Sequence, residues 1–339
     1  MSVKIGPIGQ TLTEFLKEKN YSKVIVLVDN NTKKHCYPLV KEFFPAHKLI
    51  KIKAGENYKT LETCGQIWEA MTDAELDRHS LMIDLGGGVI GDMGGFCAAT
   101  YKRGIDFIQI PTTLLAQVDA SVGGKLGIDF NGFKNHIGIF KLPETVLIDS
   151  FFLKTLPFEE LRSGFAEIVK HCLIQDDAKW KEISKLDFEE QDFNNLIAHS
   201  IEIKKKVVAA DPTEKGLRKI LNFGHTLGHA VETYFLEKKR LLHGEAIAVG
   251  MICEAFMAKE RGLIDEVFLD EIEAFVFSVY GKAPIDKEQI PDIISYTFQD
   301  KKNRGNQVRF SLLNGRGSCG FDLISDKREM KNALLYYIG

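Results

Sequence analysis

Histidines gather in one stretch of the sequence at a spacing that suits metal binding. His225 and His229 are four residues apart in LNFGHTLGHA, and His243 follows after a short polar break. A spacing of four places two side chains on one face of a helix, and histidines with a carboxylate suit zinc while leaving a position open for a substrate oxygen. Spacing alone therefore favours His225 and His229 as a metal pair, although it also suits two structural histidines. The candidate carboxylates are Glu167, Glu232 and Glu245.

A glycine run follows an apolar segment and precedes a helical pattern. Gly86, Gly88 and Gly91 in DLGGGVIGD fit the pattern G-x-G-x-x-G. Glycines let backbone amides approach a diphosphate, and the N-terminus of the following helix favours negative charge. The same letters fit a tight strand-to-helix turn, and Asp92 stands where a dinucleotide fingerprint usually has no carboxylate. The run thus leaves both interpretations open.

Basic side chains stand in otherwise apolar or glycine-rich surroundings. Lys125 ends DASVGGK, where the glycines remove bulk and leave an ammonium group near any bound anion. The segment lacks the spacing of a P-loop, so nucleoside triphosphate hydrolysis is not expected. Several such cations in a chain of balanced charge indicate a small, highly anionic substrate. The other members are Lys134, Lys170, residues 204–206, Arg218 and residues 301–302.

Alternating apolar runs and helical patterns must position these groups. Apolar runs occupy residues 24–28, 81–83, 107–110 and 146–148. Helical stretches between such strands predict parallel pairing with crossover helices, and ligands of these sheets bind beyond the carboxyl ends of the strands. From residue 158 to about residue 261 the pattern is helical almost throughout. We expect an α/β N-terminal domain with a mainly parallel sheet at residues 1–156, followed by a mostly α-helical C-terminal domain at 157–339.

Composition narrows the class of protein. The 339 residues are 45% apolar, which is enough to bury two cores. The net charge of -3 indicates no basic surface for binding nucleic acid or a membrane. No apolar stretch approaches the ~20 residues of a membrane span, and the start, MSVKIGPIGQ, lacks a signal-peptide pattern. Six scattered cysteines suit a reducing compartment. We expect a cytoplasmic protein.

Longer motifs resemble the 3-dehydroquinate synthase family. The most specific is PTTLLAQVDASVGGK at residues 111–125. The others, in the family's order, are DLGGGVIGDMGG at 84–95, Lys134-Asn135, Thr155-Leu-Pro157, and the segments 163–170, 221–232 and 243–251. The resemblance runs from about residue 29 to residue 302. The sequence differs from the family's pattern at Ala120, Leu126 and His136, and none of these differences removes a group that the chemistry needs.

The resemblance implies two cofactors, NAD and one divalent metal (zinc or cobalt). It implies that Glu167, His225 and His243 hold the metal, which frees His229 to act on the substrate. The N-terminal domain would bind NAD, and the C-terminal domain the metal and the substrate. The implied NAD contacts are Asp29, Asn31, Glu56, Lys59, Gly88, Val89, Ile90, Gly91, Asp92, Thr112, Thr113, Asp119, Lys125, Lys134, Phe152, Leu153, Lys154 and Thr155.

The resemblance also implies the substrate, 3-deoxy-D-arabino-heptulosonate 7-phosphate, whose carboxylate and phosphate match the basic side chains. Asp119, Lys170 and His229 would be catalytic. Arg103 would reach the neighbouring subunit's site, which implies a homodimer. The implied substrate contacts are Arg103, Lys125, Asn135, Lys204, Arg218, Asn222, His229 and either Lys301 or Lys302.

The implied reaction yields 3-dehydroquinate and phosphate in the shikimate pathway to chorismate and the aromatic amino acids. It proceeds by transient oxidation with NAD, phosphate elimination, re-reduction and aldol closure. One alternative is a cyclase of sedoheptulose 7-phosphate, which has no carboxylate for Lys204 and Arg218 to bind. Others are a metal-dependent polyol-phosphate dehydrogenase, which would consume NAD, and a non-catalytic NAD-binding module.

Overall fold

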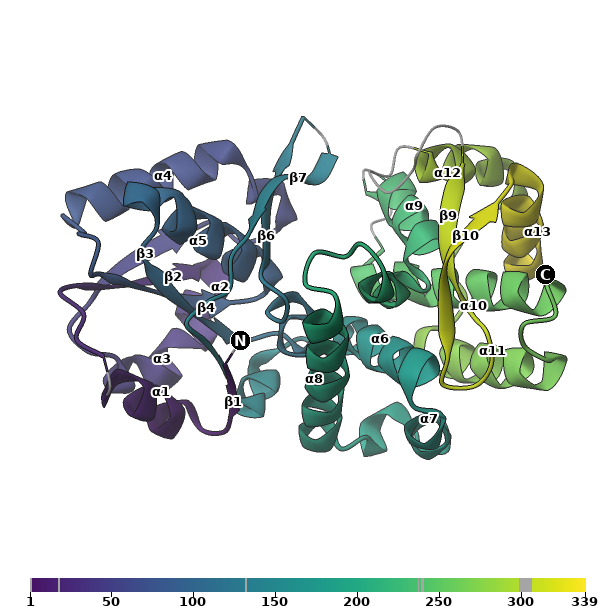
Figure 1. Cartoon of the computed structure of the whole chain (residues 1–339), viewed down its shortest axis with the longest axis horizontal. Coiled ribbons are helices and arrows are strands. Elements are labelled where there is room, and N and C mark those ends of the chain that lie inside the picture. The colour runs from purple at the N-terminus through teal and green to yellow at the C-terminus, as the bar shows by residue number, and fades with distance from the viewer. Residues whose placement is uncertain (1, 18, 132, 237, 239–240, 299–306) are drawn as a thin grey trace. The chain divides into compact units, whose positions relative to one another are not determined.

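The chain folds into two compact units, Met1–Leu161 and Arg162–Gly339 (Figure 1). The computed structural model describes residues 2–17, 19–131, 133–236, 238, 241–298 and 307–339. Two expected substrate contacts, Lys301 and Lys302, lie outside the described residues.

A six-stranded sheet forms the centre of the first unit. Its strands lie in the order β1 (Val3–Ile5), β8 (Thr145–Ile148), β5 (Asp106–Pro111), β4 (Leu81–Gly86), β2 (Val24–Asp29) and β3 (Lys48–Ile52). All neighbouring strands pair in parallel. The four predicted apolar runs became β2, β4, β5 and β8, so the expected mainly parallel sheet is confirmed.

Helices cover both faces of this sheet, because its strands are apolar on both sides. In β2, Ile25 and Leu27 pack into the core with α4 (Leu61–Asp73) and α5 (Gly88–Thr100). Val26, between them, packs on the other face with α1 (Ile8–Lys17) and α3 (Tyr37–Val40) (Figure 1). The remaining elements are α2 (Asn30–His35), the antiparallel hairpin of β6 (Lys125–Phe130) with β7 (Phe133–Phe140), a π-helical turn at Ala116–Ala120, and 3-10 turns at Lys41–Phe43, Glu56–Tyr58, Tyr101–Arg103 and Ser150–Thr155.

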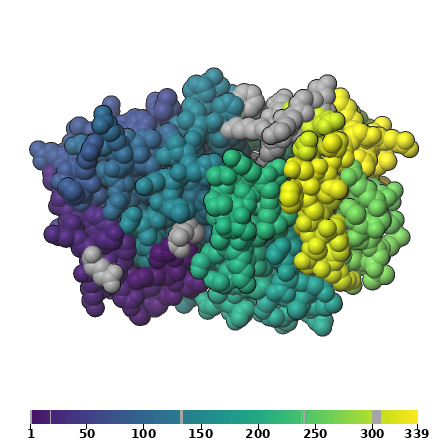
Figure 2. All heavy atoms as spheres, viewed as in Figure 1, coloured from purple at the N-terminus to yellow at the C-terminus, as the bar shows by residue number. Residues whose placement is uncertain are grey.

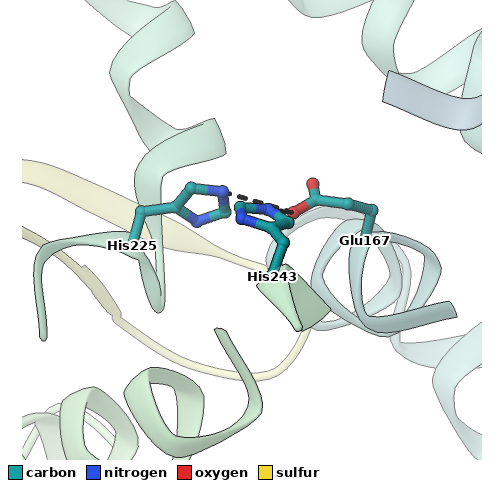
Figure 3. A group of neighbouring side chains, drawn as sticks. All are labelled: Glu167, His225 and His243. Atoms are coloured by element: carbon teal, nitrogen blue, oxygen red, sulfur yellow. Dashed lines mark ion pairs between the residues drawn. The ribbon is translucent and has the colours of Figure 1, made fainter. Parts of the chain in front are cut away.

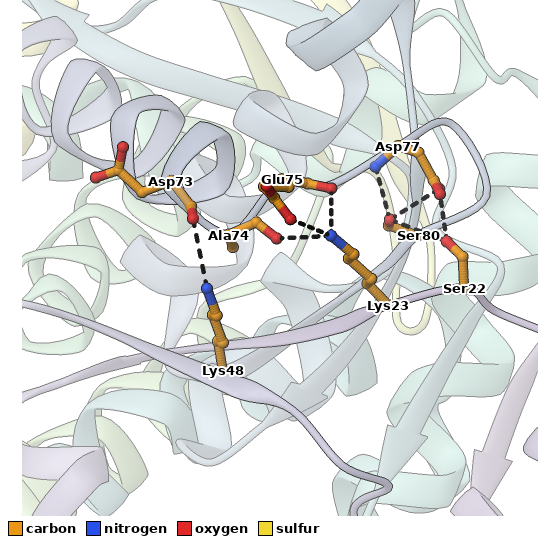
Figure 4. Close-up of polar contacts among 8 residues, drawn as sticks. All are labelled: Ser22, Lys23, Lys48, Asp73, Ala74, Glu75, Asp77 and Ser80. Carbon is orange, nitrogen blue, oxygen red and sulfur yellow. Dashed lines mark hydrogen bonds and ion pairs between the residues drawn. The ribbon is translucent and has the colours of Figure 1, made fainter.

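Lysines at the amino ends of two strands donate hydrogen bonds to carbonyls at the C-terminal end of α4 (Figure 4). Lys23 donates to the carbonyls of Ala74 (3.3 Å) and Glu75 (2.9 Å), and Lys48 donates to that of Asp73 (3.4 Å). Positive charge at a helix C-terminus satisfies carbonyls that have no partner within the helix. This network lies at the amino ends of the strands, and the opposite ends carry the glycine run.

The second unit is mostly helical, as predicted. Its helices are α6 (Phe158–Gln175), which begins just before the boundary, α7 (Asp177–Ile183), α8 (Phe193–Ala210), α9 (His225–Phe235), α10 (His243–Glu260), α11 (Glu266–Tyr280), α12 (Ile290–Thr297) and α13 (Lys327–Ile338), with 3-10 turns at Phe188–Glu190, Leu217–Asn222 and Lys287–Gln289. It also contains an antiparallel hairpin, β9 (Val308–Leu313) with β10 (Cys319–Ser325). The C-terminal residues, yellow in Figure 2, lie on the surface of this unit. Among the described residues, no helix is long and apolar enough to cross a membrane.

Candidate metal centre and glycine-rich loop

Three helices of the second unit bring one carboxylate and two histidines together (Figure 3). Glu167 lies in the middle of α6, whereas His225 and His243 are the first residues of α9 and α10. Their ligand atoms all lie within 4.8 Å of one another. Glu167 Oε1 is 3.2 Å from His225 Nε2 and 3.5 Å from His243 Nε2. Two imidazole nitrogens thus face one buried carboxylate oxygen.

Hydrogen bonds on the far side of each ring turn these nitrogens toward the carboxylate. Nδ1 of His225 lies 3.0 Å from the carbonyl oxygen of Phe223, and Nδ1 of His243 lies 3.4 Å from Oε2 of Glu232. Carbonyl and carboxylate oxygens only accept, so Nδ1 donates in both histidines. A neutral ring then has its lone pair on Nε2, the atom that a metal would use.

The charges of Glu167 and His225 suit a cation, whereas His243 would release a proton on binding one. Burial alone would raise the pKa of Glu167, but the charges of Lys170 and His225 outweigh it and hold that pKa well below its ordinary value. The Lys170 ammonium forms a buried ion pair with the Glu167 carboxylate. Burial and the charge of Lys170 lower the pKa of His225, which favours its neutral, metal-binding form. In His243 burial acts in the same direction, but contacts with Glu167 and Glu232 raise the pKa to about 10.

The carboxylate oxygen at the centre has a further property expected of a metal ligand. Oε1 of Glu167 is buried and has no hydrogen bond of good geometry within the described part of the chain, although two histidine nitrogens lie close to it. A bound cation would satisfy that oxygen and both nitrogens at once. The donor set of two imidazoles and one carboxylate also fits a divalent ion with an open position.

His229, one turn beyond His225 on α9, lies beside the same group. Its ring centroid is 5.0 Å from that of His225 and 5.8 Å from that of His243. A second possible ligand group, less buried than the first, consists of His229, Glu232 and His243. Of the three carboxylates that spacing left open, Glu167 and Glu232 therefore contact histidines. Glu245 does not: it accepts from the Leu242 amide at the start of α10 (2.9 Å) and from Arg162 (2.5 Å).

The expected substrate contacts of this unit are largely buried. Lys204 on α8 is 5% exposed and Arg218 is 2% exposed. Arg218 donates to the carbonyl of Pro212 (2.8 Å), and Asn222 donates to the Glu214 carboxylate (2.8 Å). Charged side chains are rarely this buried, and both positions stay predictions for contacts with an anion.

In the first unit the glycine run forms the junction from β4 to α5. Helix α5 begins at Gly88, and its N-cap, Gly87, offers no side chain to cap it. A Cβ on Gly87 would lie 3.0 Å from the side chain of Thr113, and one on Gly91 would lie 3.1 Å from Nε2 of Gln109. A small cavity at this junction is lined by Asp84, the glycines, Asp92, Gln109, Pro111, Ala116, Ala120 and Ser121. Gly87 and Gly91 are therefore closely packed, and the amides at the start of α5 can receive an anion.

Two residues expected to contact different ligands share one lysine in this unit. The Lys59 ammonium donates to Asp92 and to Asn135, each at 2.6 Å. Lys59 is 3% exposed. Burial lowers its pKa, but the charges of Asp92 and Glu56 raise it above the ordinary value. The structure thus connects an expected NAD contact with an expected substrate contact through Lys59.

The other residues expected to contact NAD lie on several elements. Asp29 caps α2 by accepting from the Thr32 amide (2.8 Å), and Thr113 accepts from the Ala116 amide (3.2 Å). The side chain of Phe152 is buried in the core. The remaining positions are Asn31 on α2, Glu56 in a 3-10 turn, Val89, Ile90 and Asp92 on α5, Thr112 after β5, Asp119 in the π-helical turn, Lys125 on β6, Lys134 on β7, and Leu153, Lys154 and Thr155 in a 3-10 turn.

Two polar residues near the glycine run were not singled out from the sequence. Gln109 on β5 donates to the carbonyl of Gly91 (2.9 Å). Asp84 on β4 lies opposite Gln109 in the sheet and is 1% exposed. Each is a polar residue inside an apolar strand run, which is the signal that could have identified them.

Comparison with known families finds matches along most of the chain. The family model described as 3-dehydroquinate synthase N-terminal matches residues 49–163, and the one described as 3-dehydroquinate synthase C-terminal matches residues 164–303. A curated 3-dehydroquinate synthase of Parabacteroides distasonis is 38% identical over 332 residues, which are 96% of this chain and 94% of the relative. One of Alkaliphilus metalliredigens is 41% identical over 323 residues, covering 93% and 90%.

Solved structures of cyclases resemble the whole chain. A 2-deoxy-scyllo-inosose synthase complexed with carbaglucose-6-phosphate, NAD+ and Co2+ has a TM-score of 0.86 at 25% identity, covering 98% of this chain and 95% of the other. A 2-epi-5-epi-valiolone synthase from Streptomyces hygroscopicus with NAD+ and Zn2+ bound has a TM-score of 0.83 at 25% identity, covering 99% and 96%.

Proposed function

The chain belongs to the 3-dehydroquinate synthase family, and on that premise we propose how its residues carry out the family's reaction. The family expected from the sequence motifs is confirmed. The activity is the conversion of 3-deoxy-D-arabino-heptulosonate 7-phosphate to 3-dehydroquinate and phosphate, a carbon–oxygen lyase reaction. The observation that carries the proposal is the convergence of Glu167, His225 and His243 on one point.

The cofactors are NAD and one divalent metal, as in the cyclase structures with NAD+ and Co2+ or Zn2+. When bound, the metal supplies Lewis acidity at the substrate hydroxyls and NAD takes up and returns a hydride. Glu167, His225 and His243 would hold the metal, because their donor atoms converge and two imidazoles with a carboxylate fit a divalent ion. The amides at the start of α5 would hold the NAD diphosphate in the N-terminal domain, with Asp29 among the other contacts.

The protein's own side chains would bind the two anionic ends of the substrate. Lys204 and Arg218 are proposed to bind the carboxylate, because a guanidinium presents two parallel donors to it. Asn222 and His229 would bind the phosphate, together with Lys125 and Asn135. One of Lys301 and Lys302 would also contact the substrate.

Proton transfer is assigned to two further residues. Lys170 Nζ would hydrogen-bond to the hydroxyl that is oxidised, and Asp119 would assist in removing its proton. The buried ion pair with Glu167 holds the Lys170 ammonium in one position. A fixed ammonium can stabilise a developing alkoxide without reorganising, which is how such groups lower a barrier.

We also propose a homodimer in which Arg103 contacts the phosphate bound by the neighbouring subunit. Arg103 is exposed and has a φ of 72°, a left-handed conformation that few residues other than glycine adopt. Lys102 beside it is also left-handed (φ 50°), so the support for a role across subunits is the exposed guanidinium, which can reach an anion bound by another chain. A cytoplasmic location is proposed because all six cysteines are free, which suits a reducing compartment.

The test is to measure phosphate release from the heptulosonate phosphate while NADH absorbance is followed. Release of phosphate without net NADH is expected. Stoichiometric NADH would indicate a dehydrogenase, and turnover of sedoheptulose 7-phosphate alone would indicate the other cyclase. No turnover with zinc or cobalt present would refute the proposal.

A matched pair of variants tests the carboxylate site. Arg218→Lys removes the planar pair of donors, so KM should rise roughly 10-fold or more, the effect of losing one charge-assisted hydrogen bond. Lys215→Ala removes a cation from an exposed position of the same loop and should leave KM within about twofold. Equal effects of the two changes would contradict the assignment of Arg218.

A further inference from the structure

A buried carboxylate on α10 contacts the backbone at the start of α9. Glu254 is 0% exposed in an otherwise apolar stretch of its helix. Its Oε2 accepts from the Gly224 amide at 2.6 Å, and its Oε1 accepts from the Leu227 amide at 3.0 Å. One side chain therefore caps a neighbouring helix that is 27 to 30 residues away in sequence.

Helix α9 requires a cap from elsewhere because its own N-cap residue has no side chain. Gly224 has a φ of +76°, and a Cβ there would lie 3.1 Å from the Met251 amide nitrogen of α10. Only glycine fits this close approach. The first amides of a helix have no acceptor within it, and negative charge is favoured beside them. Glu254 supplies both the acceptor and the charge.

The capped peptide group also orients a proposed metal ligand. The Phe223 carbonyl and the Gly224 amide belong to the same rigid, planar peptide unit. Glu254 binds the N–H of this unit, and His225 Nδ1 binds its oxygen at 3.0 Å. The orientation of the peptide plane thus determines where the His225 ring points, and its Nε2 lies 3.2 Å from Glu167 Oε1.

We propose that Glu254 is a positioning residue that sets the affinity of the metal site through the 223–224 peptide. Its charge polarises the peptide, which makes the carbonyl a stronger acceptor for the Nδ1 proton. A stronger bond at Nδ1 fixes the tautomer and makes Nε2 a better ligand. This inference rests on the proposed metal site at Glu167, His225 and His243.

The experiment measures the dissociation constant of Co2+ for the full chain by competition with a chelator. Glu254→Gln keeps the size of the side chain but places an NH2 group against one of the two amides, and Glu254→Ala removes both acceptors. We expect weaker Co2+ binding by roughly 10- to 100-fold, the usual effect of losing an outer-shell partner. Nitrogen-15 NMR of the histidines should show that His225 loses its fixed Nδ1–H tautomer.

A neighbouring substitution separates positioning from general destabilisation. Cys253 is buried on the same helix, and its thiol contacts the Ala333 carbonyl of α13 (3.5 Å) rather than the 223–224 peptide. Cys253→Ala should lower thermal stability while leaving the Co2+ dissociation constant within about twofold. If Glu254→Ala does not fold, the Co2+ dissociation constant of Glu254→Gln is compared with that of Cys253→Ala instead.

The outcomes distinguish failure of this inference from failure of the metal site itself. If the unmodified protein binds no Co2+, or if His225→Ala binds it equally well, the proposed metal site is wrong. If the unmodified protein binds Co2+ and His225→Ala binds it more weakly, but the Glu254 variants bind Co2+ as tightly as Cys253→Ala, the positioning role is refuted. Weaker binding with an unchanged His225 tautomer would also refute the route through the peptide.

Discussion

The buried carboxyl group of Asp84 should make the first unit less stable as the pH rises. Neither of its oxygens has a hydrogen-bond partner in the described part of the structure. Asp84 is 1% exposed, and it packs against α5 at Gly94. Burial raises the pKa of this carboxyl group well above its ordinary value. The folded protein therefore holds Asp84 in its neutral form, whereas the unfolded chain ionises it at about pH 4.

The sign and size of the effect follow from proton linkage. The folded state binds this proton more tightly than the unfolded state. The free energy of unfolding is therefore highest below the ordinary pKa of the carboxyl group, and it falls as the pH rises toward the pKa of the folded state. Between those two values the loss is about 1.4 kcal/mol for each pH unit. Asn at this position stays neutral at every pH. The stability of Asp84→Asn relative to the unmodified protein should therefore increase by about 1.4 kcal/mol per unit over that interval.

The two tryptophans allow this to be measured in the full chain. Trp68 on α4 belongs to the first unit and Trp180 on α7 to the second. In a Trp180→Phe background, fluorescence during urea unfolding reports on the unit that contains Asp84. Asp73→Asn, which removes an exposed carboxylate of the same unit, is the control for loss of surface charge.

The test depends on how the stability difference between Asp84→Asn and the unmodified protein changes with pH. A difference that is the same at every pH reflects only the change of side chain. An asparagine amide without partners costs about 1 to 3 kcal/mol at any pH. If the difference between Asp84→Asn and the unmodified protein is the same at pH 5 and pH 8, Asp84 does not carry a proton in the folded state. The interpretation of the buried carboxyl group would then be wrong.

Three further predictions concern the metal, the packing and the subunits. His243→Ala should lose bound zinc in metal analysis, whereas His229→Ala should keep it and turn over more slowly; a metal-free His229→Ala protein would contradict the assigned roles. Gly94→Ala should destabilise the protein by about 1 to 3 kcal/mol in urea unfolding, because the new methyl group would enter the space of the buried Asp84 carboxyl group. As a control, the methyl group of Gly65→Ala on α4 meets no atom within 4 Å, so this change should stabilise the protein by about 0.5 to 1 kcal/mol. Arg103→Ala should raise KM about 10-fold or more without changing the Co2+ dissociation constant. Mixing it with a Lys170→Ala protein should restore activity in mixed dimers, where one site has both side chains, and no recovery would exclude a contribution across subunits.

Much of the first unit could be predicted because its signals are local. A parallel strand buried on both faces appears as an unbroken apolar run, and Val26 lies within such a run between Ile25 and Leu27. The glycine run was likewise located between a strand and a helix from its neighbours in sequence. The hairpin of β9 and β10 was not predicted, because an antiparallel pair depends on contacts between two segments that are separate in sequence.

By itself the sequence determined the family, the sheet and the choice of histidines and carboxylates as candidate ligands. Spacing favoured His225 with His229, because a separation of four residues on one helix is a proximity that the sequence alone predicts. Tertiary structure decided which side chains meet: His225 and His243 begin separate helices, and a third helix brings Glu167 to within 3.5 Å of both. That convergence requires α10 to pack directly on the start of α9, where only glycine fits. Such contacts depend on the whole folded unit, so residue spacing could not specify them.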